Sequence, residues 1–506
     1  MTKRLISLLL LTFFIGSCAL VTASPTSTPA ATVIPTITPS PAPSATPSSQ
    51  PQTQEHLLVT RDHEHWAVLN ADGSLQRYVQ IPGIAIADPS DVSPDGNWLD
   101  YQSGSYEDEP YDLSLSLLNL DDGTSQFITN LLSPDFPENI EPVVESTFQY
   151  DQSLYKDDCT SLECRRSLVK EDVAISAGIS RWSPDGQLLA FAAQIDGPST
   201  DIYIYSMQDK TIRRLTNDLQ NVDRMEWSPD GKRLLYTNDI PGIVHDGRTF
   251  HVTDLEGKTF QLSYEILTND SQWYMHGWIS NDLYLLQALY PEPGQWHFRQ
   301  LVVVNAENGQ LTEIWPYPTS DVVIDTNNQT IVLSFYQFFF EDPIPNAPPA
   351  GTYFISTNGD REKISDHVFS FVPSSVQIIG IDHDDENAYH ILPDDSIKRI
   401  GAGVWGFVSS SSPNKKWFFL EQRERNGYYR FSLYDDTYRQ TKSWTLNEDV
   451  RAASWRPDSL GIFLFTSDNI YYLSIPDGEP QLLNVEVPPC LWDPVACTLP
   501  SFAWRP

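Results

Sequence analysis

The stretch Ser180–Asp218, SRWSPDGQLLAFAAQIDGPSTDIYIYSMQDKTIRRLTND, decides the fold of this chain. Its Ser183–Gly186 segment is typical of a tight turn, because proline fixes φ, aspartate bonds to nearby backbone and glycine adds no Cβ clash. Two runs of strand-forming residues follow at 188–192 and 202–205, with shorter runs at either end of the stretch. The stretch therefore predicts four antiparallel strands in about forty residues, the size of one propeller blade.

The same opening recurs along the chain at the period of a blade. The two strongest copies stand 45 residues apart and consist of Trp182, Pro184, Asp185 and Gly186, and of Trp227, Pro229, Asp230 and Gly231. Weaker openings follow steps of about 40 to 50 residues and lie near Ser93, Ile279, Asp325, Pro373, Ser412 and Arg456. We therefore predict an all-β chain with a single β-propeller of four-stranded antiparallel blades, eight or nine in number, or seven if degenerate units merge.

The two strongest copies resemble the TolB-type propeller repeats, a WD-repeat-like family. Its blades carry Trp-Ser-Pro-Asp-Gly, then an apolar strand, then Ile-Tyr, as the segments from Trp182 and from Trp227 do in part or whole. The resemblance extends over His56–Pro506 and implies the propeller fold. Because TolB-type domains dock envelope partners, it also implies protein binding, although the matching residues build blades rather than contact a partner.

The two ends of the globular region predict how the ring closes. The region begins at His56 with sequence that matches the later strands of a blade and lacks an opening strand. Ser501–Pro506, SFAWRP, reads like the opening of a further repeat. We therefore expect this C-terminal strand to join the N-terminal strands in one composite blade, which leaves no open sheet edge, and a frayed tail is the alternative.

The N-terminal region is predicted to be a lipoprotein signal peptide followed by a stalk. Residues 1–17 contain Lys3 and Arg4 followed by an apolar run. The end of this segment together with Cys18 resembles a bacterial lipobox. Residues 18–55 would be a lipidated cysteine and a stalk rich in proline, threonine and serine. We expect a palmitate-bearing lipoprotein on the extracytoplasmic face of a bacterial envelope; an ordinary signal peptide or a short membrane anchor is the alternative.

Residues 132–179 fit no blade and are predicted to be an insertion within the propeller domain, 56–506. The insertion holds Cys159 and Cys164, and Cys490 and Cys497 precede the C-terminal strand. An even number of cysteines outside the cytoplasm indicates two disulfides, and we favour the two local pairs among the three possible connectivities. A four-cysteine zinc site is the rival interpretation, but its usual spacing is missing.

Charge and residue types limit the partners. A net charge of −35, from 67 acidic against 32 basic residues, argues against nucleic acid, which needs a basic surface. His63 with His65, and the acidic run Asp382–Glu386, could hold a metal, yet a polar turn and an acidic hairpin loop explain them more simply. We expect a monomer without metal or cofactor.

The leading functional hypothesis is a binding or scaffold module for an envelope protein, peptide or glycan. The sequence contains no Gly-x-Ser-x-Gly, no His-Glu-x-x-His and no phosphate-binding glycine loop, so we predict no catalytic residue and no enzyme. The alternative is an extracytoplasmic enzyme that cleaves glycans or peptides with carboxylates at the central channel of the propeller. A purely structural lipoprotein is a third hypothesis.

Overall fold

The computed structural model describes one compact unit, Thr53–Pro506, from residue 56 onward. The described residues are 56–505, with gaps at 61–64, 83–84, 87–90, 106–110, 148–160, 240–248, 263–271, 293–294, 318, 320, 337–345, 373–375, 383, 395, 403–407, 424–428, 449, 467 and 487–500. Cys18 and the predicted stalk therefore lie outside the described residues.

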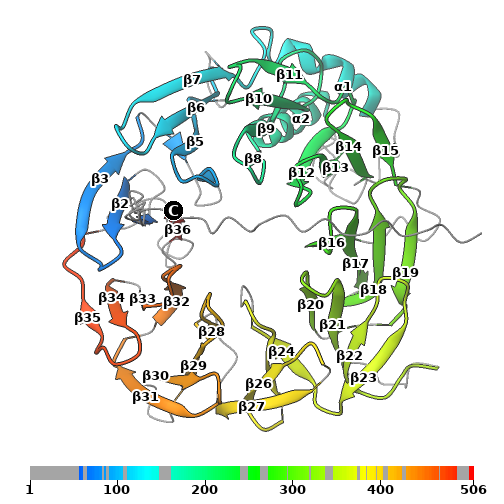
Figure 1. The fold of residues 1–506 in the computed structure, drawn as a ribbon. Coiled ribbons are helices and arrows are strands. Elements are labelled where there is room, and N and C mark those ends of the chain that lie inside the picture. Colours follow the sequence, from blue (N-terminus) through cyan, green and yellow to red (C-terminus); the bar gives the residue numbers. More distant parts are fainter. Residues whose placement is uncertain are drawn as a thin grey trace, which may run out of the picture. The chain divides into compact units, whose positions relative to one another are not determined.

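In this part of the chain the strands form nine four-stranded antiparallel sheets, and the sheets are arranged as the blades of a ring (Figure 1). The first strand of each blade lies nearest the centre of the ring and the fourth lies at its periphery (Figure 1). This arrangement is a β-propeller, as predicted, with the higher of the expected blade numbers.

Blades 1 to 5, from the innermost to the outermost strand, have the following bounds. Blade 1 contains β36 (Ser501–Arg505), β1 (His56–Thr60), β2 (His65–Asn70) and β3 (Leu75–Gln80). Blade 2 contains β4 (Ala85–Ile86), β5 (Trp98–Ser103), β6 (Ser114–Asn119) and β7 (Ser125–Asn130). Blade 3 contains β8 (Ser180–Trp182), β9 (Leu188–Ala193), β10 (Asp201–Ser206) and β11 (Ile212–Arg214). Blade 4 contains β12 (Asn221–Trp227), β13 (Arg233–Asp239), β14 (Thr249–Asp254) and β15 (Thr259–Gln261). Blade 5 contains β16 (Gln272–Trp278), β17 (Leu283–Glu292), β18 (Gln295–Asn305) and β19 (Leu311–Trp315).

Blades 6 to 9 continue the same order. Blade 6 contains β20 (Asp321–Asp325), β21 (Thr330–Phe335), β22 (Gly351–Ile355) and β23 (Arg361–Ser365). Blade 7 contains β24 (Phe369–Phe371), β25 (Ile379–Asp382), β26 (Asn387–Ile391) and β27 (Ile397–Ala402). Blade 8 contains β28 (Ser410–Ser411), β29 (Trp417–Arg423), β30 (Tyr429–Asp435) and β31 (Gln440–Leu446). Blade 9 contains β32 (Val450–Trp455), β33 (Gly461–Thr466), β34 (Ile470–Ser474) and β35 (Gln481–Leu482).

The predicted closure of the ring is confirmed. Strand β36 pairs antiparallel with β1 over five residues, from Ser501 opposite Thr60 to Arg505 opposite His56. The first blade is thus built from both ends of the propeller domain, and the inner edge of β1 is covered by β36.

The repeated Ser-Pro-Asp-Gly segment forms the turn between the first two strands of a blade. In blade 3, the Ser183 hydroxyl donates a hydrogen bond to Asp185 at 2.6 Å and accepts one from the backbone N–H of Leu188 at 2.9 Å. Gly186 has a φ of 68°, which residues with a Cβ rarely adopt. Blade 8 keeps the same bonds with Asn414 in place of the aspartate, because an amide oxygen also accepts from Ser412.

The hydrophobic core lies between adjacent blades. One cluster joins blade 3 to blade 4 and consists of Ala190, Ala192, Ile202, Ile204, Leu215, Val222, Met225, Trp227, Leu234 and Tyr236. Similar clusters occur between other neighbouring blades. Since each sheet is apolar on both faces in this way, no blade can bury its core residues without two neighbours.

Tryptophans at the end of the innermost strands join neighbouring blades by hydrogen bonds. The indole Nε1 of Trp182 donates to the backbone oxygen of Asp91 at 2.9 Å, and that of Trp227 donates to the backbone oxygen of Arg181 at 2.9 Å. The indole Nε1 of Trp455 also donates to the preceding blade, to the side-chain hydroxyl of Ser410 at 2.9 Å. Each bond ties a blade to the blade before it.

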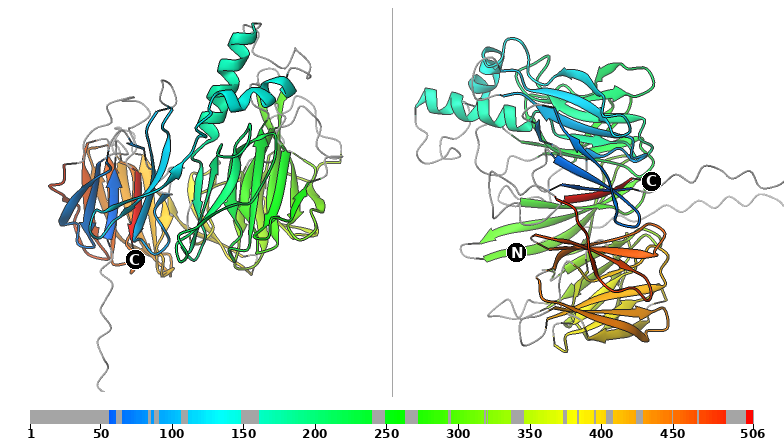
Figure 2. Two further views of the ribbon diagram at one scale, coloured as in Figure 1. Left: turned by 90° about the horizontal axis from the view of Figure 1, so that it is seen from above. Right: turned by 90° about the vertical axis from the view of Figure 1, so that its left-hand side faces the viewer.

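The segment predicted to be an insertion carries helices between blades 2 and 3. These are η2 (Glu138–Ile140), α1 (Glu141–Thr147) and α2 (Leu162–Ser176), and Figure 2 shows α1 and α2 on one face of the ring. Their apolar residues join the core of blades 2 and 3, as Val143 and Val173 do. None of the described helices has the length and apolar character needed to cross a membrane.

We expect Trp227→Phe to lower the free energy of unfolding by about 1–2 kcal/mol, because the backbone oxygen of Arg181 loses its donor while most apolar area is kept. Urea unfolding of the purified chain measures this loss. Trp417→Phe is the matched control, since the indole N–H of this half-buried residue has no hydrogen bond to the described part of the chain. Equal losses in the two variants would contradict a role for the inter-blade bond.

Candidate functional site

A cavity of 620 Å³ lies along the inner wall of the ring at blades 2 to 4. Its walls are the innermost strands β8 and β12, together with one residue each from β5 and from the segment before it. The lining residues are Asp91, Gln102, Gly178, Ile179, Ser180, Arg181, Asp223, Arg224, Met225 and Glu226. This volume is within the range of sites that bind small ligands or a few peptide residues.

A glycine sets the close approach of blades 2 and 3 at one end of the cavity. Gln102 donates a side-chain hydrogen bond to the backbone oxygen of Gly178 at 2.8 Å. Gly178 has a φ of 99°, and a Cβ at this position would collide with the amide of Gln102. Only glycine therefore permits β8 to begin where it does.

Asp100 lies behind the cavity in the middle of β5 and is buried. The hydroxyl of Ser180 donates to its Oδ2 at 2.5 Å. Burial raises the pKa of Asp100 well above its usual value, and the negative charge of Asp91 raises it further. The second strand of blade 2 thus buries, beside the cavity residue Ser180, a carboxyl group whose charged form is disfavoured.

Glu226 lines the cavity itself from β12. Burial raises the pKa of Glu226, while a hydrogen bond from the Tyr284 hydroxyl and the charges of Arg181 and Arg224 act in the opposite direction. The Tyr284 hydroxyl donates to Oε2 at 2.8 Å, and burial together with Glu226 keeps the pKa of Tyr284 far above its usual value. Tyr284 therefore stays a donor and holds Glu226 in place, and a carboxyl with a raised pKa can exchange protons closer to neutral pH.

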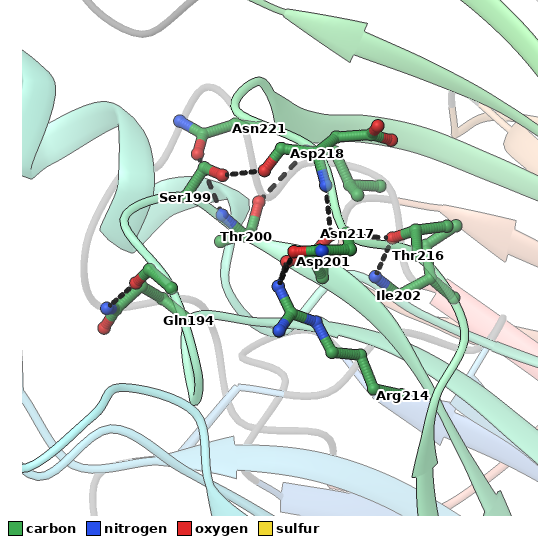
Figure 3. A network of polar contacts seen from close by, with 12 residues as sticks. Gln194, Ser199, Thr200, Asp201, Ile202, Arg214, Thr216, Asn217, Asp218 and Asn221 are labelled. Atoms are coloured by element: carbon green, nitrogen blue, oxygen red, sulfur yellow. Dashed lines mark hydrogen bonds and ion pairs between the residues drawn. The ribbon is translucent and has the colours of Figure 1, made fainter. Parts of the chain in front are cut away.

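A second polar cluster lies at the crossing from blade 3 to blade 4 (Figure 3). The buried carboxylate of Asp201 accepts hydrogen bonds from the Thr216 hydroxyl and from the backbone N–H of Asp218, both at 2.9 Å, and forms an ion pair with Arg214. Arg214, Thr216 and Asp218 also line a cavity of 430 Å³. Burial raises the pKa of Asp201, with the hydrogen bonds opposing it. Because these groups satisfy one another, the cluster holds the crossing in place.

The residues singled out in the sequence lie beside the inner wall and not in the cavity. Trp182 and Trp227 end the strands that form its walls, and their indoles face the neighbouring blades. The remaining motif residues, Pro184, Asp185, Gly186, Pro229, Asp230 and Gly231, belong to the turns. They therefore position the wall without contributing to its chemistry.

The predicted disulfide and metal residues fall largely outside the described part of the chain. Cys164 lies in the first turn of α2 and is disulfide-bonded, but Cys159, Cys490 and Cys497 are outside the described residues, so the two local pairings remain predictions. His63 is likewise outside. His65 begins β2, and Asp382 is buried at the end of β25, paired with His367. Among the described residues, no group of three or more histidine, cysteine, aspartate or glutamate side chains could hold a metal ion.

Sequence reasoning missed the residues of the cavity. Glu226 stands directly before Trp227 and Arg224 stands three residues before it in the segment DRMEWSPDGKR, and Arg181 stands directly before Trp182. The available signal was a charged residue next to the tryptophan that ends an innermost strand. Asp100 gave no signal, because a single aspartate within a strand does not reveal which residue of the next blade it meets.

Comparison with known proteins supports a propeller with relatives among peptidases. No family model matches the chain. The chain is 31% identical to the uncharacterized peptidase YuxL of Bacillus subtilis over 134 residues. This matched stretch makes up 26% of this chain and 18% of that peptidase. The chain therefore matches less than a fifth of the length of this relative.

Several solved structures are similar to this chain. They include TolB of Acinetobacter baumannii, at 16% identity over 60% of this chain and 62% of TolB with a TM-score of 0.29. They also include an oligogalacturonate lyase in complex with manganese, at 14% identity over 60% and 86% of the two chains with a TM-score of 0.33. Dipeptidyl peptidase 4 of Porphyromonas gingivalis has 11% identity over 85% and 64%, with a TM-score of 0.45. The nine-bladed ring confirms the fold that the predicted TolB-like resemblance implies.

The prediction that the chain is not an enzyme is contradicted by the match to YuxL, because the matched protein is a peptidase. The prediction rested on the absence of local catalytic motifs. A ring of blades assembles its inner wall from residues that are far apart in the sequence, and a motif search cannot find such a site.

We expect Asp100→Asn to change how stability depends on pH. Since the pKa of Asp100 is raised in the folded chain, the wild type loses stability as pH rises from about 4, where the unfolded aspartate ionises, toward the higher folded pKa. Asparagine keeps the acceptor for Ser180 and does not ionise. The Tm of the variant, measured by scanning fluorimetry, should therefore exceed that of the wild type by a margin that grows between pH 4.5 and pH 8. Asp209→Asn, at an exposed hairpin turn, is the control, and an identical pH slope for wild type and Asp100→Asn would contradict this account.

Proposed function

We propose that this propeller binds peptides at its inner wall and takes part in cleaving them. The observation that carries the proposal is the Glu226 carboxyl, which lines a cavity at the inner wall with a raised pKa and beside two arginines. The match to a peptidase favours peptides over glycans as the substrate class. We therefore assign to Glu226 of blade 4 the role of a carboxylate expected at the channel of a propeller enzyme.

In this proposal Glu226 acts as the general base and then as the general acid. Its carboxylate takes a proton from a water molecule while the water oxygen attacks the peptide carbonyl carbon. The same proton passes to the amide nitrogen as the C–N bond breaks, which gives a free carboxylic acid and a free amine. Tyr284 is a positioning residue, because its hydroxyl holds Oε2 of Glu226.

The test is hydrolysis of a mixture of synthetic octapeptides by the purified chain, followed by mass spectrometry of the products. We expect cleavage by the wild type and a rate lowered by about 10² or more in Glu226→Gln, the usual contribution of a general acid or base. Glutamine still accepts the hydrogen bond from Tyr284, so the fold of the wall should be kept. Glu362→Gln, at an exposed site on β23, should cleave like the wild type.

Two outcomes would overturn the proposal. Cleavage at an unchanged rate in Glu226→Gln would remove Glu226 from the reaction. Binding of peptides without any cleavage by the wild type would show a binding module and return the function to the scaffold hypothesis.

We further propose that the chain is anchored by lipid at Cys18 on the extracytoplasmic face of a bacterial membrane. The support is the sequence before Cys18 and the uncharged, proline-rich segment after it. Growth of a bacterial host with labelled palmitate should label the wild type and not Cys18→Ala, and only the wild type should sediment with membranes. Equal labelling of the two chains would exclude Cys18 as the lipid attachment site.

A further inference from the structure

Two guanidinium groups share the cavity at the inner wall. Arg181 comes from β8 of blade 3 and Arg224 from β12 of blade 4, and both line the cavity. Each is exposed while its neighbours in the strand are buried or half-buried. The bond from Trp227 to the backbone oxygen of Arg181 fixes the two strands side by side at this point.

Both arginines retain donors for a ligand. Arg181 donates from Nη1 to the backbone oxygen of Ser180 at 2.6 Å. Arg224 lies 3.9 Å from the Asp223 carboxylate through Nε, with more than half of its side chain exposed. A guanidinium has five N–H donors, so these contacts leave the ends of both groups available. Arg214 differs, because it is bound to Asp201 and Asn217 in the polar cluster of Figure 3.

The acids nearby do not compete fully for these donors. Glu226 has one oxygen bound by Tyr284, and the raised pKa of Asp100 favours its neutral form. Asp91 and Asp223 also line the cavity, and the Asp223 carboxylate lies 3.9 Å from Nε of Arg224. With three carboxylates and two guanidinium groups in its lining, the cavity carries no net positive charge, so an anion would be held there by direct N–H donors of the two arginines.

We propose that Arg181 and Arg224 bind the free α-carboxylate of a peptide. Guanidinium groups recognise carboxylates through paired N–H···O bonds in one plane, which gives direction as well as strength. This inference rests on the proposed function and adds the class of substrate: a peptide with a free C-terminus. Because Glu226 lies in the same cavity, a peptide held by its C-terminus presents one of its last peptide bonds to this carboxyl. The chain would then trim peptides from the C-terminal end.

The test measures binding and does not depend on cleavage. A dye-labelled alanine tetrapeptide is titrated with the full chain carrying Glu226→Gln, and binding is followed by fluorescence anisotropy. Three forms of the peptide are compared: the free acid, the C-terminal amide, and the amide with one internal glutamate. We expect the free acid to bind at least about tenfold more tightly than either amide, since charge-assisted bonds are lost with the carboxylate.

Variants of the two arginines then test whether the cavity causes the difference in affinity between the free acid and the amides. Arg181→Gln and Arg224→Gln should each weaken binding of the free acid by about tenfold and change the amide little. Arg213→Gln, at an exposed position on the outermost strand of blade 3, should bind like the parent. Circular dichroism of each variant verifies that the propeller is folded.

The outcomes separate this inference from the proposed function. Three outcomes would overturn the carboxylate site. The free acid could bind no more tightly than the simple amide, it could bind no more tightly than the glutamate-bearing amide, or no form of the peptide could bind. Octapeptide cleavage by the wild type would stand in each of those cases. Selective binding of the free acid without cleavage would support the carboxylate site and overturn the role of Glu226.

Discussion

The hydrogen bond from an indole N–H of one blade to the blade before it constrains how several neighbouring blades of this ring meet. A blade of four short strands buries too little surface to be stable alone, and its two faces need neighbours at a fixed distance. Apolar packing between blades stabilises the ring but does little to fix the position of one blade against the other. The bonds from Trp182 and Trp227 fix this position, because a donor on one blade must meet a single backbone oxygen on the preceding blade. The same bonds place β8 beside β12 and so shape the cavity at the inner wall.

Most of the fold could be predicted because its information is local. The serine hydroxyl, the aspartate and the glycine of one turn act within six residues of sequence, and the structure shows this turn in blades 3 and 4 where the motif is complete. Blade 6 has lost the motif, yet Asp325 still closes the turn by accepting from the backbone of Asn327 and Asn328. The closing strand could be predicted because Trp504 repeats the tryptophan of the motif and bonds to Ser454 of blade 9.

The site could not be predicted because its information is non-local. Asp100 and Ser180 are 80 residues apart, and Glu226 and Tyr284 are 58 apart. Their contacts exist only once consecutive blades are stacked in register. A pattern of turns gives the number and order of the blades, but it does not say which side chain of one inner strand faces which side chain of the next. The same limit explains why a search for compact catalytic motifs led to a wrong prediction about enzymatic activity.

The pairing of β36 with β1 also sets the order in which the molecule can mature. During synthesis, β1 to β3 emerge first and β36 emerges after nearly all of the chain. Until then the inner edge of β1 is an unpaired row of backbone donors and acceptors, open to pairing with another chain. Ring closure is therefore a post-synthetic step between distant segments, with the slow kinetics of non-local pairing. The chain therefore cannot close its ring before its C-terminal strand has been made.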